Sequence, residues 1–311
     1  TWPSEYMLAS TWNADLAYEM GEGMGEDGLY GGVQGWYGPA VNIHRTPFAG
    51  RNFEYYSEDS YLSGVFGYQA VNGAATKGMY AFLKHFALND QETHRDHLGL
   101  VTWAGEQAIR EIYLKPFQMV IEDNTVEITY NEAIRDESGN ITGYTAKKTV
   151  VPAATGIMSS FNRIGPTWAG GNYNLLTEIL RNEWGSNAFV LTDYEVASYM
   201  FTDLCLAAGG DAKLKTVCLA GNMLFGYSLD GNAEDQGYAR EAAHRILYTV
   251  VHSSGMNGFV HGVEYVNGFA YYKFIVIAWD ILAAAGVCVL AFFIVKKVKR
   301  NLEIKKNNGE E

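Results

Sequence analysis

Short apolar runs alternate with amphipathic stretches over the first part of the chain. Four runs have the length and apolar content of buried strands, at residues 36–43, 79–87, 155–161 and 188–194. Residues 104–121 and 174–183, which lie between these runs, have apolar positions at helical spacing. Buried strands that alternate with helices are typical of a parallel sheet with helical crossovers. The pattern therefore predicts an α/β fold, either an open doubly wound sheet or a barrel.

Two further segments depart from this alternation. Residues 123–151 contain two β-rich stretches on either side of the polar string DESGN, which predicts an inserted β-hairpin on the surface. Residues 236–253 carry one apolar stripe at helical spacing and predict a helix, and we expect a linker over 256–273 after it. Residues 1–255 are expected to form one α/β domain.

The most apolar segment is residues 274–295, in which Asp280 is the only charged residue. A helix of this length is about 33 Å long, enough for a hydrocarbon core of about 30 Å. The basic cluster KKVKR follows it, so the positive-inside rule places the tail, 296–311, in the cytoplasm. We expect a single-pass protein of the cell membrane that contacts lipid through 274–295 and carries its main domain outside the cell. A buried core helix is the alternative.

Composition narrows the range of partners. The first 295 residues hold 17 basic and 32 acidic residues, a net charge of −15, and the whole chain carries −12. An acidic body repels phosphate backbones, so we expect no binding to nucleic acid. Three cysteines in 311 residues cannot form a disulfide scaffold.

Two short motifs point only weakly to cofactor or metal chemistry. Gly23, Gly25 and Gly28 have the spacing of a dinucleotide-binding loop, but the segment before them is helical and acids lie inside the loop. A helix end and turn is the better interpretation. His94 and His97 have the spacing of metal ligands without a third ligand beside them, and we interpret them as histidines of the surface or of a site rim. We expect neither a metal nor a cofactor.

Polar residues gather where the predicted strands end. Lys84 and His85 lie late in the second run, and Thr192 and Asp193 lie at the end of the fourth. The other polar positions near strand ends are Asn42, His44, Arg45, Arg51, Asn89, Asp90, Glu92, Ser159, Ser160 and Asn162. Buried strands rarely carry unpartnered charge, and the carboxyl ends of the strands form the active-site face of an α/β barrel. The pattern predicts a site at that face, with scattered structural salt bridges as the alternative.

Arg51, Lys84 and His85, together with the carboxylate of Asp193, suit a ligand rich in hydroxyl groups. Charged donors fix ring hydroxyls, and we expect the neighbouring cations to lower the pKa of Asp193 and to keep it ionised. Sugar is a natural candidate, because aromatic side chains on which sugar rings can stack lie near the strand ends. These are Trp36, Tyr37, Phe161, Trp168, Trp184 and Tyr194, most of which could equally be core residues.

Six strings, in this order, resemble glycoside hydrolase family 3, the family of many β-glucosidases and β-xylosidases. They are YGPAVNIHRTPFAGRNFEYYSED at 37–59, KHFALNDQETHR at 84–95, REIYLKPF at 110–117, GIMSSFNRIGPTWAGGN at 156–172, LTDY at 191–194 and AGGD at 208–211. The resemblance implies an incomplete (β/α)8 TIM-like barrel and a glycosidase that acts on an oligosaccharide or glycoside without a cofactor.

The resemblance also implies roles for individual residues. Asp193 in LTDY matches the catalytic nucleophile, and Arg51, Lys84 and His85 match residues that hold the hydroxyls of the glycone. Further substrate contacts are implied at Met158 and Phe161, which match subsite walls, and at Tyr194 beside the nucleophile. Phe161 stands where many members have Tyr, and Tyr194 stands where others have Trp.

Parts of the family pattern are not found in the 311 residues. The glycone-binding Asp of a DGPxGxR-like motif and the first barrel strands are expected upstream of Thr1. The α/β-sandwich domain that supplies the acid/base Glu is expected there too, so this upstream part of the same protein is an expected partner. In the N-acetylglucosaminidase branch a loop histidine is the acid/base, which would give His94 or His97 that role. The string KHFALND differs from the KHFPGHG-like pattern of that branch.

Two functional hypotheses follow from these observations. The first is a retaining glycosidase that acts on β-linked glucosides or related sugars through a glycosyl-enzyme on Asp193. The second is a membrane-tethered carbohydrate-binding pseudoenzyme, or an inactive fragment without the acid/base. The two hypotheses differ in turnover, and the residues leave the identity of the sugar open.

Overall fold

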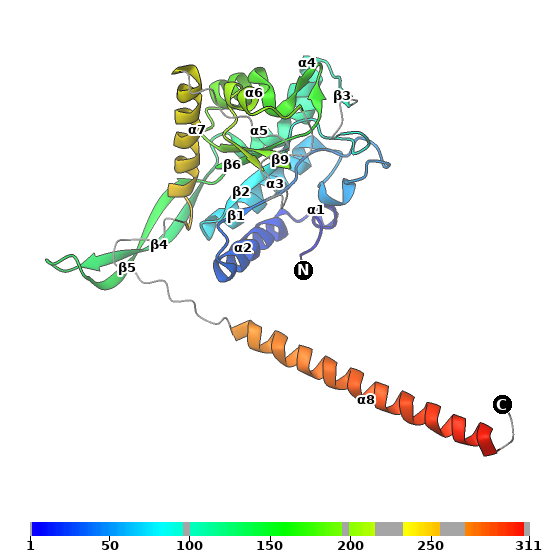
Figure 1. The fold of residues 1–311 in the computed structure, drawn as a ribbon. Helices are drawn as coiled ribbons and strands as arrows, with labels where there is room; N and C mark the ends of the chain where they lie inside the picture. Colours follow the sequence, from blue (N-terminus) through cyan, green and yellow to red (C-terminus); the bar gives the residue numbers. More distant parts are fainter. Residues whose placement is uncertain (1, 96–99, 195–198, 215–232, 256–270, 308–311) are drawn as a thin grey trace. The chain divides into compact units, whose positions relative to one another are not determined.

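The main sheet of the molecule is parallel and curled like half of a barrel (Figure 1). The structure is a computed structural model that describes residues 2–95, 100–194, 199–214, 233–255 and 271–307. Five strands lie in the spatial order β1-β2-β6-β9-β10, and every neighbouring pair is parallel. They are β1 (Gly35–Trp36), β2 (Tyr80–Phe86), β6 (Gly156–Ser159), β9 (Phe189–Tyr194) and β10 (Ala212–Leu214). The predicted α/β fold is confirmed, and of the two predicted forms the barrel describes it better.

The first strand is shorter than its apolar run predicts. β1 ends at Trp36, and Pro39, which has no N–H to donate, interrupts the ladder. Contact with β2 resumes beyond Pro39 as a single bridge between Ala40 and Lys84, and the Val41 N–H donates to the Lys84 carbonyl at 2.9 Å. The run therefore follows β2 toward the end of the sheet without being a regular strand.

Helices cover one face of this sheet (Figure 1). The α-helices of the main body are α1 (Glu5–Ala9), α2 (Ala14–Gly31), α3 (Ser60–Thr76), α4 (Glu106–Ala108), α5 (Lys115–Ile121), α6 (Thr202–Ala207) and α7 (Ala233–Val251). Of the two stretches expected to be helical, the middle of 104–121 is the π-helix η2 (Ile109–Tyr113), and 174–183 is the π-helix η4 (Asn174–Glu183). Short 3₁₀ turns form η1 (Asn52–Glu54) and η3 (Ala169–Gly171), and a small second sheet consists of β3 (Val101–Thr102), β7 (Arg163–Ile164) and β8 (Thr167–Trp168).

The two faces of the strands bury different apolar clusters, because successive side chains in a strand point to opposite sides. On the helix-covered face, Leu83 and Ile157 pack with Phe66 of α3 in the main core. On the other face, a second cluster contains Phe82, Met158 and Leu191, with further partly buried residues of β2, β9 and β10 packed against it. This second cluster, which we call the inner layer, lies on the concave side of the sheet.

The Gly23-x-Gly25-x-x-Gly28 motif lies inside α2 and not at a helix end and turn, so that interpretation was wrong. A Cβ on Gly25 would lie 2.6 Å from the Cβ of Lys77, and one on Gly28 would lie 2.1 Å from the Cε of Met79. The two glycines thus allow α2 to approach the end of α3 and the start of β2 closely. Their spacing reflects packing between elements.

The hairpin expected over 123–151 is formed by β4 (Thr125–Arg135) and β5 (Ile141–Pro152), which pair antiparallel. In its turn, Oδ1 of Asp136 accepts from the N–H groups of Ser138 and Asn140, each at 2.9 Å. Gly139 adopts a φ of 84°, which favours glycine. The polar string in the sequence is therefore a turn closed by an aspartate side chain.

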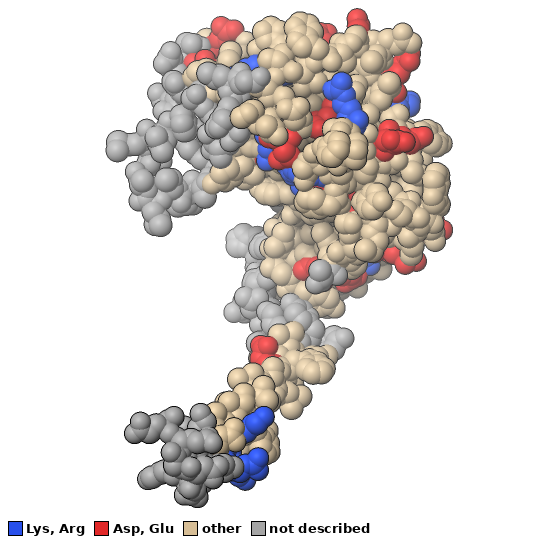
Figure 2. Space-filling view, turned by 90° about the vertical axis from the view of Figure 1, so that its right-hand side faces the viewer, with Lys and Arg blue, Asp and Glu red and all other residues tan. Residues whose placement is uncertain are grey.

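The chain separates into two units, Thr1–Gly262 and Val263–Glu311. The helix of the second unit is α8 (Tyr271–Asn307). Its stretch Phe274–Asn301 contains an 18-residue window with a mean hydropathy of 2.4, so it is long and apolar enough to cross a membrane. Figure 2 shows this helix in the neutral colour over most of its length, with basic atoms gathered toward its end. Residues 271–273 of the expected linker and 296–307 of the expected tail belong to the same helix, and 256–270 lie outside the described residues.

A buried ion cluster ties the helices to the sheet below the site. The carboxylate of Asp211 is fully buried and lies 3.3 Å from Nη2 of Arg181 and 2.7 Å from Nε of Arg245. Its Oδ2 also accepts from the N–H of Val190 at 2.7 Å. Burial raises the pKa of Asp211 although both arginines oppose the rise. Asp211 thereby joins η4, α7 and β9.

We predict that Asp211→Asn lowers the free energy of unfolding by about 3–5 kcal/mol, because it leaves two largely buried guanidinium groups without a charged partner. Urea unfolding at pH 7 measures the change. The control is Glu183→Gln, which breaks an ion pair with Arg110 whose side chains are 43% and 40% exposed. That change should cost about 1 kcal/mol or less. Equal losses in the two variants would show that the Asp211 cluster is no stronger than a surface pair.

Candidate active site

The site lies at the carboxyl end of the parallel sheet, above the inner layer. Lys84 follows Phe82 by two residues in β2, and Asp193 follows Leu191 by two residues in β9, so both polar side chains lie on the same face as the inner layer. Arg51 reaches the same place from the residue before η1. Of the residues expected at the site, the structure thus brings together Arg51, Lys84, His85 and Asp193.

Five side chains form a closed ring of contacts, which we call the charge ring. Nη2 of Arg51 lies 2.9 Å from Nε2 of His85, and Nε2 lies 3.7 Å from Oδ2 of Asp193. On the other side, Nη1 of Arg51 lies 3.7 Å from Oε1 of Glu92, and Oε2 of Glu92 lies 3.1 Å from Nε of Arg95. Nη1 of Arg95 closes the ring at 3.9 Å from Oδ2 of Asp193.

Lys84 joins the ring through Glu54. Its Nζ lies 3.2 Å from Oε2 of Glu54, and Oε1 of Glu54 pairs with Nε of Arg51. Burial lowers the pKa of Lys84, and the charge of Arg51 lowers it further. The ammonium group therefore sits in a mostly desolvated place where a carboxylate holds it.

His85 is neutral, so the expectation that it acts as a charged donor was wrong. A guanidinium can only donate, so Nε2 of His85 accepts from Arg51 and its proton is on Nδ1. Oη of Tyr55 lies 3.3 Å from Nδ1 and 3.1 Å from the Asn89 carbonyl, and therefore accepts from the first and donates to the second. Burial, and after it the nearby cations, holds the pKa of His85 well below its ordinary value.

The pKa of Asp193 is raised, contrary to the expectation that neighbouring cations lower it. Burial is the largest effect, and it outweighs the hydrogen bond from the Tyr194 N–H and the charges of Arg95, Arg51 and Lys84. The N–H of Tyr194 donates to Oδ1 of Asp193 at 2.7 Å, whereas Oδ2 makes no hydrogen bond to any described residue. Oδ2 is therefore the oxygen that can react without breaking a hydrogen bond.

The three remaining predicted site residues, Met158, Phe161 and Tyr194, lie near the charge ring and differ in their burial. Met158 is buried in the inner layer, below the charges. Phe161 is buried beneath Arg95, whose guanidinium carbon lies 4.6 Å from the centre of its ring. Tyr194 is 39% exposed. Met158 and Phe161 thus support the site from below, and Tyr194 is the exposed member of the three.

The residue pattern gives no role to Glu54, Tyr55 or Arg95, although all three contact the predicted residues. A signal for Glu54 does exist, because its position three residues after Arg51 suits an ion pair within one helical turn. His94 lies in a turn beside Arg95, and His97 lies outside the described residues. Within the described ranges, no three His, Cys, Asp or Glu side chains gather as metal ligands.

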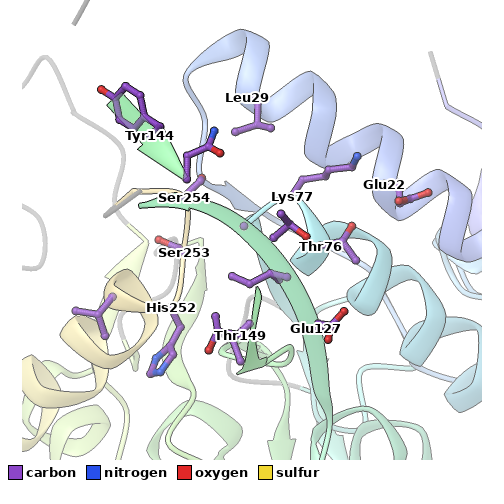
Figure 3. A pocket seen from close by; sticks show the side chains of 16 residues that line it. Glu22, Leu29, Thr76, Lys77, Glu127, Tyr144, Thr149, His252, Ser253 and Ser254 are labelled. Atoms are coloured by element: carbon purple, nitrogen blue, oxygen red, sulfur yellow. The ribbon is translucent and has the colours of Figure 1, made fainter. Parts of the chain in front are cut away.

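Two cavities lie away from Asp193. The first, of about 860 Å³, is lined by α2, the end of α3, the hairpin and the residues after α7, and Figure 3 shows Glu22, Lys77, Glu127 and His252 around it. The second, of about 490 Å³, is lined by residues of α1 and of the 44–58 segment. His44 and Arg45, which follow the first predicted strand, line this second cavity and do not join the charge ring.

Comparison with known proteins identifies the family to which the chain belongs. Residues 1–216 match the family model of the glycosyl hydrolase family 3 N-terminal domain. β-Glucosidase A of Butyrivibrio fibrisolvens is 35% identical over 212 residues, which are 68% of this chain and 22% of that protein. An exo-α-(1→6)-L-arabinopyranosidase of Bifidobacterium longum is 36% identical over 187 residues, 60% of this chain and 21% of that protein. The chain thus spans about a fifth of the length of these relatives.

A solved structure shows the same architecture. β-Glucosidase 3B of Thermotoga neapolitana, determined in complex with glucose, superposes with a TM-score of 0.68 at 30% sequence identity. The match covers 90% of this chain and 35% of that chain.

Asp90, six residues after Lys84 in the chain, is a buried carboxyl group with few polar contacts. Its side chain is 5% exposed, and neither oxygen makes a hydrogen bond to a described residue. Arg45, which is half exposed, approaches only to 3.9 Å. Burial raises the pKa of Asp90 from 3.8 to about 6, and Arg45 offsets only part of the rise.

We predict that Asp90→Asn stabilises the protein at neutral pH. A carboxyl group whose pKa is higher in the folded state loses stability as it ionises, so the penalty grows between about pH 4 and pH 6. Two pKa units correspond to about 3 kcal/mol, which Asp90→Asn should recover at pH 7 and not at pH 4. Urea unfolding of both proteins across this range is the measurement. A difference independent of pH would contradict the assignment.

Proposed function

Because the chain belongs to glycoside hydrolase family 3, we propose that the protein hydrolyses O-glycosyl bonds of β-linked glucosides or related sugars with Asp193 as its nucleophile. The observation that carries the proposal is the placement of one carboxylate oxygen at the end of a barrel strand, without a hydrogen bond and between His85 and Arg95. A nucleophile needs such an oxygen, and the strand ends of this fold are where catalytic groups lie.

The proposed reaction is a double displacement that retains the configuration of the sugar. Oδ2 of Asp193 bonds to the anomeric carbon while the glycosidic C–O bond breaks and its electron pair leaves with the departing oxygen. A general acid protonates that oxygen, and the same group then removes a proton from the water that hydrolyses the glycosyl-enzyme. Burial keeps the Asp193 carboxylate poorly hydrated, and positive charge that develops at the anomeric carbon offsets the cost of this burial.

Glu92 of the charge ring and Glu54 beside it are poor choices for the general acid. Glu92 is engaged through both oxygens, by Arg51 and by Arg95, and Glu54 is held between Arg51 and Lys84. Protonation of a leaving group would require either glutamate to abandon these partners. We therefore assign the acid/base role to the Glu that the family resemblance implies in an additional domain, and not to Glu54 or Glu92.

We propose that charged side chains donate hydrogen bonds to the sugar and that uncharged side chains orient them and form the walls of the site. Arg51 and Lys84 donate to the glycone hydroxyls, and hydrogen bonds of this kind tighten as charge develops in the transition state. His85 contributes by orienting Arg51, because its neutral Nε2 accepts from the guanidinium group. Tyr194 offers its exposed ring to the substrate, and Met158 and Phe161 keep the walls in place.

We also propose that α8 anchors the protein in the cell membrane, with the sugar site outside the cell. The apolar stretch of α8 is long enough to span, and the basic cluster at 296–300 follows it. A basic cluster directly after the span, on the cytoplasmic side, agrees with the positive-inside rule.

Asp193→Ala in the intact protein is expected to lower kcat on an aryl β-glucoside by roughly 10³-fold or more, because the covalent step disappears. Azide should restore part of the turnover by entering the vacated space. The control is Asp203→Asn, an exposed aspartate of α6, which should leave kcat unchanged. Near-normal turnover of Asp193→Ala would remove the residue from the role, and sugar binding by a wild type without turnover would favour the pseudoenzyme.

Deletion of residues 274–311 should release an active protein from intact cells, whereas the full chain should stay with the membrane through a high-salt wash. Protease added outside the cells should digest the main body and spare an epitope fused after residue 311. Digestion of the epitope with protection of the body would reverse the proposed orientation.

A further inference from the structure

Glu54 occupies a position between two groups that come from different parts of the fold. Arg51 directly precedes the short 3₁₀ turn η1 and Glu54 is its last residue, and residues three apart in such a turn lie on one side. Lys84 comes from β2. Oε1 of Glu54 pairs with Nε of Arg51, and Oε2 lies 3.2 Å from Nζ of Lys84. Its side chain is 14% exposed, so the carboxylate is largely enclosed by these contacts.

We propose that Glu54 is a positioning residue that holds Arg51 and Lys84 at a fixed separation on the glycone side of the site. The inference rests on the proposed function and adds to it a residue that exchanges no atom with the substrate. Each oxygen of the carboxylate is assigned to one cation, so the single side chain fixes both.

The reason for such a residue is electrostatic. Arg51 and Lys84 carry like charges in a site with little water, so they repel each other more strongly than they would in solvent. Lys84 also has a long, flexible stem that loses rotamer freedom when its ammonium group is fixed. A carboxylate between the two cations offsets the repulsion and selects one arrangement of both.

The same geometry indicates what happens when Glu54 is lost. The other carboxylates that attract Lys84 are Glu5 of α1 and Asp193 of β9. Without Glu54, the ammonium group turns toward one of these. If it turns to Asp193, it pairs directly with the proposed nucleophile and leaves the glycone hydroxyls. Loss of Glu54 should therefore lower turnover as well as sugar binding.

The test compares Glu54→Gln, Lys84→Ala and the double variant in the intact protein. Glu54→Gln should lower kcat/KM on an aryl β-glucoside by about 10²-fold, as a misplacement of positioning groups does. In the Lys84→Ala background the same change should cost less than about 10-fold, because one of the two groups that Glu54 holds is already gone. Glu58→Gln, an exposed glutamate four residues away, is the matched control and should leave kcat/KM unchanged.

Urea unfolding of each variant separates positioning from stability. We expect Glu54→Gln to unfold at a lower urea concentration than the wild type, because Lys84 loses a carboxylate 3.2 Å from its Nζ, and to stay folded in the kinetic assay. If it fails to fold, Glu54→Asp, which keeps the charge but is one methylene shorter, should show the loss in kcat/KM. Equal losses of kcat/KM in both backgrounds, or a loss of stability with unchanged kcat/KM, would overturn the positioning role.

The rate of the wild type shows whether a negative result overturns only the positioning role of Glu54 or the proposed function as well. An active wild type with unaffected Glu54→Gln and Glu54→Asp variants overturns only the role of Glu54. A folded wild type that hydrolyses no aryl glycoside overturns the proposed function and the positioning role together.

Discussion

Mutual neutralisation of charge at one end of the sheet is the constraint on which the site depends. Three cations and three carboxylates meet there with little access to water, and unpaired charges in such a place would be expensive. They are Arg51, Lys84, Arg95, Glu54, Glu92 and Asp193. Each lies within 4 Å of an opposite charge, and the contacts link η1, β2, the turn after β2 and β9. The loops at the strand ends are therefore held to the sheet by the same groups that form the site.

The position of these charges depends in turn on layers below them. Met158 pairs in register with Leu191 across β6 and β9, and a slip of one residue would move Asp193 to the helix-covered face. Asp211 resists such a slip, because its carboxylate accepts from the N–H of Val190 while it holds arginines of η4 and α7. The inner layer and the Asp211 cluster thus fix the register of β9 and the face of the sheet on which Asp193 lies. In the proposed mechanism neither contains a residue that touches the sugar.

The sequence predicts the fold and the location of the site better than the electrostatics of the site. Apolar runs identified β2, β6 and β9, because a buried parallel strand leaves a local pattern of apolar residues. Polar residues at the ends of those runs identified Lys84 and Asp193. The neutral state of His85 and the raised pKa of Asp193 depend on burial and on distances between residues far apart in the chain, which no local pattern records. The helical glycines of α2 likewise reflect tertiary packing.

The neutral state of His85 has a consequence for the nucleophile. His85 lies between Arg51 and Asp193, with its Nε2 2.9 Å from the guanidinium and 3.7 Å from the carboxylate. A protonated histidine there would pair directly with Asp193, lower its pKa and bind the oxygen that has to react. Because Nε2 accepts from Arg51, it has no proton to offer, and Oδ2 keeps its lone pairs free. On the other side of the imidazole, Oη of Tyr55 accepts from Nδ1 of His85, and Asn89 hydrogen-bonds to that hydroxyl. These contacts hold the proton of His85 on Nδ1 and so keep Nε2 without one. In the proposed mechanism, the buried tyrosine and asparagine therefore protect the reactivity of Asp193 without contacting it.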